Sequence, residues 1–136
     1  MSERLFELIL AVKRKCQSNE ERIQGELGLS QAQFNGLIVL DEGGALAGGE
    51  FARRMALSVS RGSRVLTALA ADGYVQVREG TGDRRAVSIS LTPKGRRTRQ
   101  RIFRRMEACE SRICRALAEQ HVGELRSALR RLAAVL

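Results

Sequence analysis

The chain has 136 residues, of which 43% are hydrophobic, and it carries a net charge of +9, one proline and three cysteines. This length suits one ordinary domain with its own core, and the odd cysteine count argues against a disulfide scaffold and fits a reducing compartment. No run of about 18 uncharged apolar residues occurs, and the N-terminal residues lack a signal-peptide cleavage pattern. We therefore expect a cytoplasmic protein that does not enter a membrane.

The positive charge is concentrated in the middle of the chain. Residues 49–105 have a net charge of +10, whereas residues 1–48 and 106–136 have net charges of −2 and +1. A basic centre between nearly neutral flanks is typical of a surface that binds a polyanion. The charge pattern favours a nucleic-acid partner and leaves the flanks for another role.

Helical signals dominate the first third of the chain. Apolar residues recur at helical spacing over residues 5–16 and cover more than one face, which predicts a helix that packs on several sides. Ser30 and Gln33 have the spacing of a capping box, so a second helix should run to about Leu40. A short third helix is predicted over residues 50–56, and a tight turn should follow it.

The next segment is the candidate recognition helix. Ser58 is a natural N-cap, and the helix should continue to about Ala71, where Asp72-Gly73 offers a left-handed stop. Helical spacing predicts an inner face of Val59, Gly62, Val65, Leu66 and Leu69. The same spacing predicts a polar outer face of Ser60, Arg61, Ser63, Arg64 and Thr67.

A β-hairpin and two further helices complete the predicted elements. Residues 74–78 and 86–91 alternate apolar and polar side chains around a glycine-containing basic tip, as hairpin strands do. Thr92-Pro93 is a strong helix start, and apolar stripes ending at Leu117 and Leu136 predict the last two helices. The expected fold is mainly α with a small β-hairpin.

The central segment carries side chains that suit DNA. Arginine can bond guanine O6 and N7 together in the major groove, so we expect Arg61 and Arg64 at base edges and the helix serines nearer phosphates. Arginines at the hairpin tip suit a minor groove, with Asp83 orienting one of them. The predicted DNA-binding residues are Ser58, Ser60, Arg61, Ser63, Arg64, Thr67, Asp83, Arg84, Arg85 and Lys94.

Within residues 46–95, Asp83-Arg84-Arg85 is followed by Leu91-Thr92-Pro93-Lys94-Gly95. With this motif above all, residues 46–95 resemble the MarR family of bacterial transcription regulators. The resemblance implies a winged helix-turn-helix in a homodimer that reads a pseudo-palindromic DNA site, and it implies that Arg85 is the wing arginine and Asp83 its brace. Gly62 departs from the branched apolar residue that is usual there, so the recognition helix is expected to lie closer to the helix before it.

The expected organisation is a single domain over residues 1–136. Residues 30–95 form the DNA-binding region, and residues 1–29 and 96–136 form N- and C-terminal dimerisation helices, whose apolar surface exceeds what a small winged domain can cover. The expected partners are double-stranded DNA, a second copy of the chain and a small-molecule effector. In such a family the protein most often acts as a repressor.

Two other functions stay open at this stage. One is a thiol-based redox sensor that uses Cys16, Cys109 or Cys114, although small buried hydrophobes are the more ordinary interpretation of these cysteines. The other is a winged-helix module that binds protein or RNA. No set of nucleophile, base and orienting residue can be assembled, and no metal-ligand spacing occurs, so no enzymatic activity, metal or cofactor is predicted.

Overall fold

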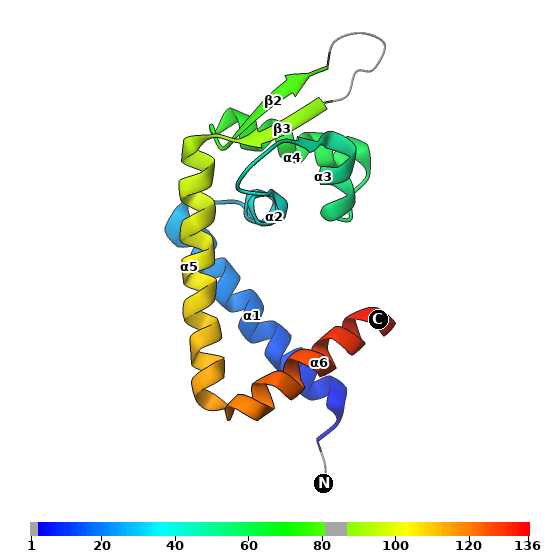
Figure 1. Ribbon diagram of the computed structural model, residues 1–136, viewed down its shortest axis with the longest axis vertical. Helices are drawn as coiled ribbons and strands as arrows, with labels where there is room; N and C mark the ends of the chain where they lie inside the picture. Colours follow the sequence, from blue (N-terminus) through cyan, green and yellow to red (C-terminus); the bar gives the residue numbers. More distant parts are fainter. Residues whose placement is uncertain (1–2, 81–86) are drawn as a thin grey trace. The chain divides into compact units, whose positions relative to one another are not determined.

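The computed structural model describes residues 3–80 and 87–136. It divides into two compact units, Met1–Ile102 and Phe103–Leu136, and the division falls within one long helix. The element order is α1, α2, β1, α3, α4, β2, β3, α5 and α6 (Figure 1). The fold is mainly helical with a small antiparallel sheet, as predicted.

The first two helices have sharply defined ends. Helix α1 (Leu5–Leu27) ends at Gly28, which has a φ of 67° that glycine adopts without strain. Helix α2 (Gln31–Val39) begins with the predicted capping box: the Ser30 hydroxyl accepts the Gln33 N–H at 3.1 Å, and the Gln33 side chain accepts the Ser30 N–H at 3.0 Å. The sequence therefore determines where α2 starts.

Helices α3 (Gly48–Arg54) and α4 (Val59–Ala71) form the helix-turn-helix. The turn between them contains Ala56 with a φ of 56°, a left-handed conformation that glycine would adopt more easily. Gly73, with a φ of 77°, follows α4 and turns the chain toward the sheet. Figure 1 shows α3 and α4 beside the two strands of the wing.

The sheet has three strands in the order β1-β3-β2. The hairpin pairs β2 (Val75–Glu79) with β3 (Val87–Leu91), with Val75 opposite Leu91 and Val77 opposite Ile89. Strand β1 (Leu46–Ala47) pairs with the other edge of β3, Leu46 lying opposite Ile89. Periodicity does not predict β1, because two residues are too short for a readable alternation.

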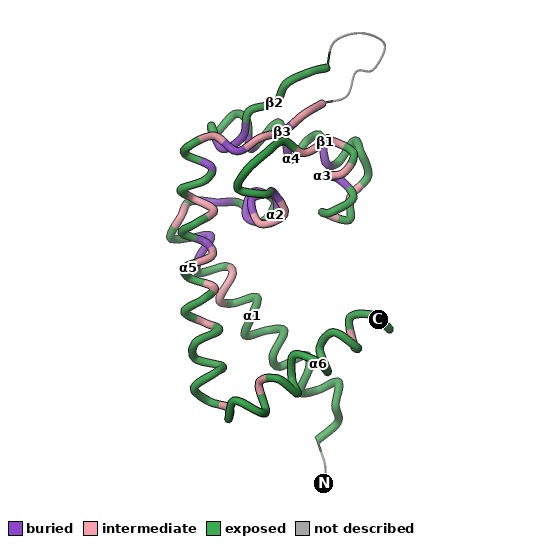
Figure 2. The backbone as a smooth tube through the Cα atoms, in the orientation of Figure 1, coloured by how far each residue is buried: buried purple, intermediate pink, exposed green. Residues whose placement is uncertain are grey.

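The core of the first unit lies where α2, α3, α4 and the sheet meet (Figure 2). Its fully buried side chains come from all of these elements and from the first turns of α5 (Pro93–Ala116), and they are Phe34, Leu37, Leu40, Phe51, Leu69, Ile89 and Ile102. Aromatic rings from α2 and α3 supply much of this buried area. The core fixes α4 against α3 and β2.

The predicted inner face of α4 is right except at its first residue. Gly62, Val65, Leu66 and Leu69 are buried, but Val59 is 71% exposed. The expectation that Val59 packs inward is wrong, because α4 rests on α3 at Gly62 and the first turn extends past that contact. The recognition helix thus presents an apolar side chain to solvent.

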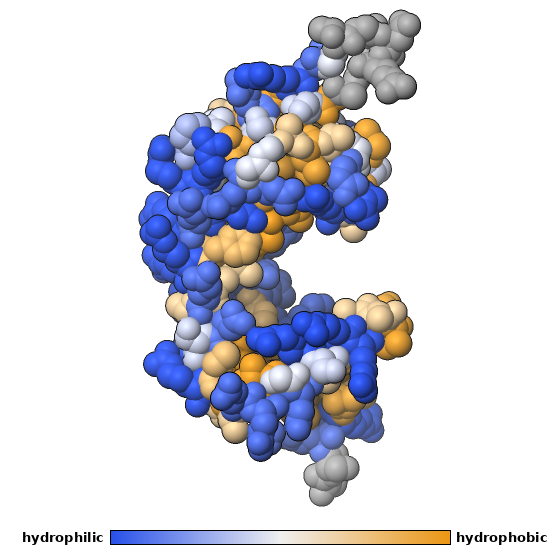
Figure 3. All heavy atoms as spheres, viewed as in Figure 1, coloured by the Kyte–Doolittle hydropathy of each residue, from blue (hydrophilic) through white to orange (hydrophobic). Residues whose placement is uncertain are grey.

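The second unit contains the end of α5 and helix α6 (Glu119–Val135), which has no buried residue. An ion pair of 4.0 Å joins Arg126 and Glu110 within it. Apolar residues (orange) are visible on the surface of both units in Figure 3. In the single chain, the exposed large apolar side chains of this unit are Ile113, Leu125, Leu129, Val135 and Leu136.

Candidate nucleic-acid interface

The outer face of α4 is polar and basic. Ser58 caps the helix, since its hydroxyl accepts the Arg61 N–H at 3.2 Å. The predicted outer residues are all exposed, namely Ser60, Arg61, Ser63, Arg64 and Thr67. The Thr67 hydroxyl donates to the Ser63 carbonyl oxygen at 3.0 Å, so it already has a partner within the helix.

The two arginines of α4 are available to a ligand. In the part of the chain that the structure describes, neither the Arg61 nor the Arg64 side chain has a hydrogen bond or ion pair. An exposed guanidinium keeps its five donors for a planar acceptor pair such as a guanine edge or a phosphate. The arrangement therefore suits an anionic partner that approaches along α4.

Close packing holds α4 on α3. A Cβ at Gly62 would lie 2.8 Å from the Cβ of Ala52 and 3.2 Å from its Cα. Ordinary carbon contacts are about 3.5–4.0 Å, so the two helices approach as near as a glycine permits. The sequence-based expectation of a close approach at Gly62 is confirmed.

The base of the wing is tied to the end of α4. The Thr92 hydroxyl donates to the Gly73 carbonyl oxygen at 2.5 Å and accepts the Gly95 N–H at 3.0 Å. A Cβ at Gly95 would overlap the Tyr74 carbonyl oxygen, so only glycine fits there. These contacts fix the first turn of α5 against the residues that link α4 to β2.

Lys94 takes part in the same junction. Its ammonium donates to the Asp72 carbonyl oxygen at 2.6 Å and lies 4.6 Å from the centroid of the Tyr74 ring. The positive charge of Lys94 is stabilised by the partial negative charge at the C-terminal end of α4 and by the face of the Tyr74 ring. Its role in DNA binding stays a prediction. The wing-tip residues Asp83, Arg84 and Arg85 lie outside the described residues.

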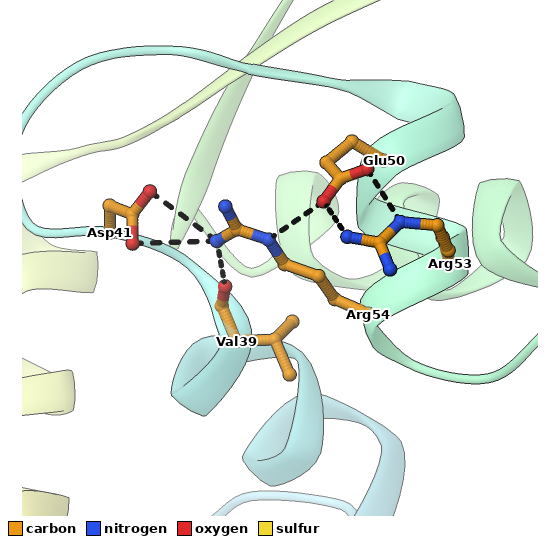
Figure 4. Close-up of polar contacts among 5 residues, drawn as sticks. All are labelled: Val39, Asp41, Glu50, Arg53 and Arg54. Atoms are coloured by element: carbon orange, nitrogen blue, oxygen red, sulfur yellow. Dashed lines mark hydrogen bonds and ion pairs between the residues drawn. The ribbon is translucent and has the colours of Figure 1, made fainter.

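A cluster of charges joins α3 to the end of α2 (Figure 4). The Arg54 guanidinium lies between the two helices: it donates to the Val39 carbonyl oxygen at 2.9 Å and pairs with Asp41 and Glu50, each at 3.3 Å. Arg53 pairs with the same Glu50 carboxylate. The hydrogen bond from Arg53, helped by the one from Arg54, lowers the pKa of Glu50 from 4.5 to about 2 and raises that of Arg53. Arg54 thus caps α2 in addition to carrying surface charge.

A second link connects α2 to α4. The Gln33 side chain, which is 6% exposed, donates to the Asp72 carboxylate at 2.6 Å. The same side chain completes the α2 capping box, so one amide fixes the start of α2 and the end of α4. Sequence reasoning found the cap and missed the link, because the two residues are 39 positions apart.

Comparison with known proteins shows which family has this sequence pattern. The sequence profile of the MarR family matches residues 27–86, which include α2, the helix-turn-helix and β2. Residues 27–86 thus have the sequence of the MarR family. A search of the curated proteins found no match to the sequence.

Solved structures of MarR-family proteins share the whole fold. A transcriptional regulator of the MarR family from Silicibacter pomeroyi is 26% identical, with a TM-score of 0.74 over 95% of this chain and 87% of that one. NadR in complex with 4-hydroxyphenylacetate is 20% identical, with a TM-score of 0.74 over 100% and 96%. The apo form of wild-type MarR from E. coli is 20% identical, with a TM-score of 0.73 over 97% and 98%.

The MarR-family proteins that this chain resembles are transcriptional regulators and not enzymes. Within residues 3–80 and 87–136, no helix is long and apolar enough to cross a membrane. The same residues contain no group of three or more metal-ligating side chains close enough to hold an ion.

Proposed function

We propose that this protein binds double-stranded DNA sequence-specifically, with α4 in the major groove. The observation that carries the proposal is the outer face of α4, on which two arginines, without a partner among residues 3–80 and 87–136, stand among exposed hydroxyl side chains. An α-helix fits the major groove, and arginine and serine bond base edges and phosphates there. Residues 30–95 are the proposed DNA-binding region, and the wing residues Asp83, Arg84 and Arg85 are proposed to reach the adjacent minor groove.

We further propose that the DNA-binding form is a homodimer. Helix α1 leaves a run of large apolar side chains exposed in the single chain, and α6 leaves another; those of α1 are Leu5, Phe6, Leu8, Ile9, Leu10 and Val12. Exposed apolar surface of this extent is typical of an interface. Two copies related by a twofold axis would set two α4 helices about 34 Å apart, to read a pseudo-palindromic site in successive major grooves.

A small-molecule effector is proposed to modulate the protein, which would then act in the cytoplasm as a repressor. The support is the similarity of its fold to NadR in complex with 4-hydroxyphenylacetate. The first unit also contains an open cavity of about 590 Å3 beside the first turn of α5, lined by Glu42, Arg96 and Thr92 among others. Differential scanning fluorimetry with 4-hydroxyphenylacetate tests this part, and an unchanged melting temperature at millimolar concentration would remove this compound class.

Selection of bound duplexes from a random DNA library tests the DNA-binding proposal directly. A single enriched sequence with twofold symmetry is expected. Binding of that duplex should weaken steeply with salt, with a slope of log K against log salt of about −0.9 for each neutralised phosphate. Equal affinity for every duplex would refute the proposal and favour a protein- or RNA-binding module.

Two single variants show whether α4 carries the specificity. Arg64→Ala should weaken binding of the selected duplex by about 1–3 kcal/mol and relax the preference at one position of each half-site. Arg130→Ala removes the same charge from an exposed position in α6 and should leave the selected sequence unchanged. Identical selected sequences from Arg64→Ala and the parent would show that Arg64 does not contact a base.

Thiol sensing remains the second candidate function, because Cys16 and Cys114 are exposed in the single chain and Cys109 is partly exposed. An exposed thiol is open to oxidation, which a buried structural cysteine resists. The test compares the parent with a variant that has serine at all three positions. If peroxide releases DNA from the parent and not from the variant, the protein senses thiol oxidation; equal release from both excludes it.

A further inference from the structure

The first residue of α4 is an exposed valine. Val59 is 71% exposed, and it is the large apolar side chain that α4 turns to solvent. Ser63, which is also exposed, lies four positions later and therefore on the same side of the helix. An isopropyl group at this point contributes nothing to the core and is open to contact with a partner molecule.

The surroundings of Val59 form an apolar floor on the wing side of α4. A shallow cavity of about 260 Å3 is lined by Val59, Ser63 and Leu66 of α4, by Val87 of β3, and by residues 47–49. The rim is open at Gly49, where a Cβ would meet nothing within 4 Å. An apolar group of methyl size that approaches α4 from outside would therefore contact Val59 without obstruction.

Duplex DNA is the occupant that fits the charge around this floor. Arg61 and Arg64 are exposed in the same turns of α4, and their guanidinium groups repel a cationic partner and attract phosphates. Residues at the N-terminal end of a recognition helix contact base edges. The apolar group that base edges present in the major groove is the 5-methyl of thymine.

We propose that Val59 recognises the 5-methyl group of a thymine in each half-site. This inference rests on the proposed DNA-binding function and adds a specificity-determining residue that supplies no hydrogen bond. Burial of one methyl group against the valine should contribute about four-fold to affinity, the equivalent of ~0.8 kcal/mol. Val59 would thus distinguish thymine from cytosine and uracil at one position.

Uracil substitution in the selected duplex isolates this contact, because deoxyuridine pairs like thymidine and lacks only the methyl group. Each thymine of the selected site is replaced in turn, and the dissociation constant is measured at fixed salt. The parent should bind about four-fold more weakly when one position of a half-site carries uracil. At that position Val59→Ala should bind thymine and uracil duplexes equally.

Matched controls keep the result interpretable. Val135→Ala makes the same change at an exposed valine of α6, in the proposed dimer surface, and should keep the parent's ratio of thymine to uracil affinity even if the overall affinity changes. Because Val59 is exposed, Val59→Ala should retain the circular dichroism spectrum and melting temperature of the parent. Uracil tolerance at every position by the parent, or unchanged uracil sensitivity in Val59→Ala, would overturn the assignment while specific binding stands. Failure to recover any specific duplex would refute the proposed function, and the role of Val59 with it.

Discussion

Replacing Gly62 by alanine tests the packing that positions the recognition helix. The added Cβ would stand 2.8 Å from the Ala52 Cβ, so α3 and α4 must separate by roughly 1 Å to restore ordinary contact. Neither atom can rotate away, because both are bonded directly to helix backbone. Overpacking of this kind costs about 1–3 kcal/mol, whereas alanine gains roughly 1 kcal/mol of helix propensity over glycine. The expected net effect is a destabilisation of about 1 kcal/mol.

Urea unfolding followed by circular dichroism measures this effect, and DNA binding reports the shift of α4. Gly62→Ala should lower the free energy of unfolding and weaken binding of the selected duplex. Gly25→Ala is the control, since a Cβ at Gly25 meets nothing within 4 Å in α1, and it should stabilise the protein. Ala52→Gly combined with Gly62→Ala restores the space and should recover DNA affinity. The packing argument is refuted if Gly62→Ala stabilises as much as Gly25→Ala and leaves DNA affinity unchanged.

Three further predictions concern the contacts that hold α2, α3, α4 and α5 together. Gly95→Ala should destabilise the fold by about 3 kcal/mol or more in urea unfolding, because its Cβ would overlap the Tyr74 carbonyl oxygen; a loss below 1 kcal/mol would mean that α5 shifts freely. Gln33→Ala should cost about 2 kcal/mol by removing the bond to the Asp72 carboxylate, and the loss should be smaller in an Asp72→Ala background. Glu50→Gln should be less stable than the parent at neutral pH, and the difference in the free energy of unfolding should vanish as pH falls from 4.5 to about 2. The pKa of Glu50 is lower in the folded state, so the ionised carboxylate stabilises the fold above the unfolded-state pKa and stops doing so once it is protonated. A difference that does not change with pH would contradict this.

Local signals carried most of the fold prediction. The Ser30 and Ser58 caps, the Gly73 stop and the alternation of the hairpin act over a few residues, so they can be read along the chain. What failed depended on contacts between elements. Val59 has the spacing of an inward residue, but the point at which α4 rests on α3 is set by Gly62 and Ala52, which no periodicity reveals.

The same limit applies to the candidate site. Exposure of the polar face of α4 was predictable, because the opposite face is apolar at helical spacing. The partners of Arg54 and Gln33 were not, since the carboxylates of Asp41 and Asp72 are brought near only by the packing of α2 against its neighbours. Only the pairs within α3 are local, since Glu50 precedes the arginines by three and four positions.

The first turn of α5, which contains Gly95, is joined directly to the end of the recognition helix. Because Gly95 touches the Tyr74 backbone, and Lys94 holds the last carbonyl of the α4 cap, no compliant loop separates the two helices at this point. A displacement of the first turn of α5 would therefore disturb the contacts that it makes at the end of α4. A ligand that shifts this turn needs no contact with α4 to change how the protein holds DNA.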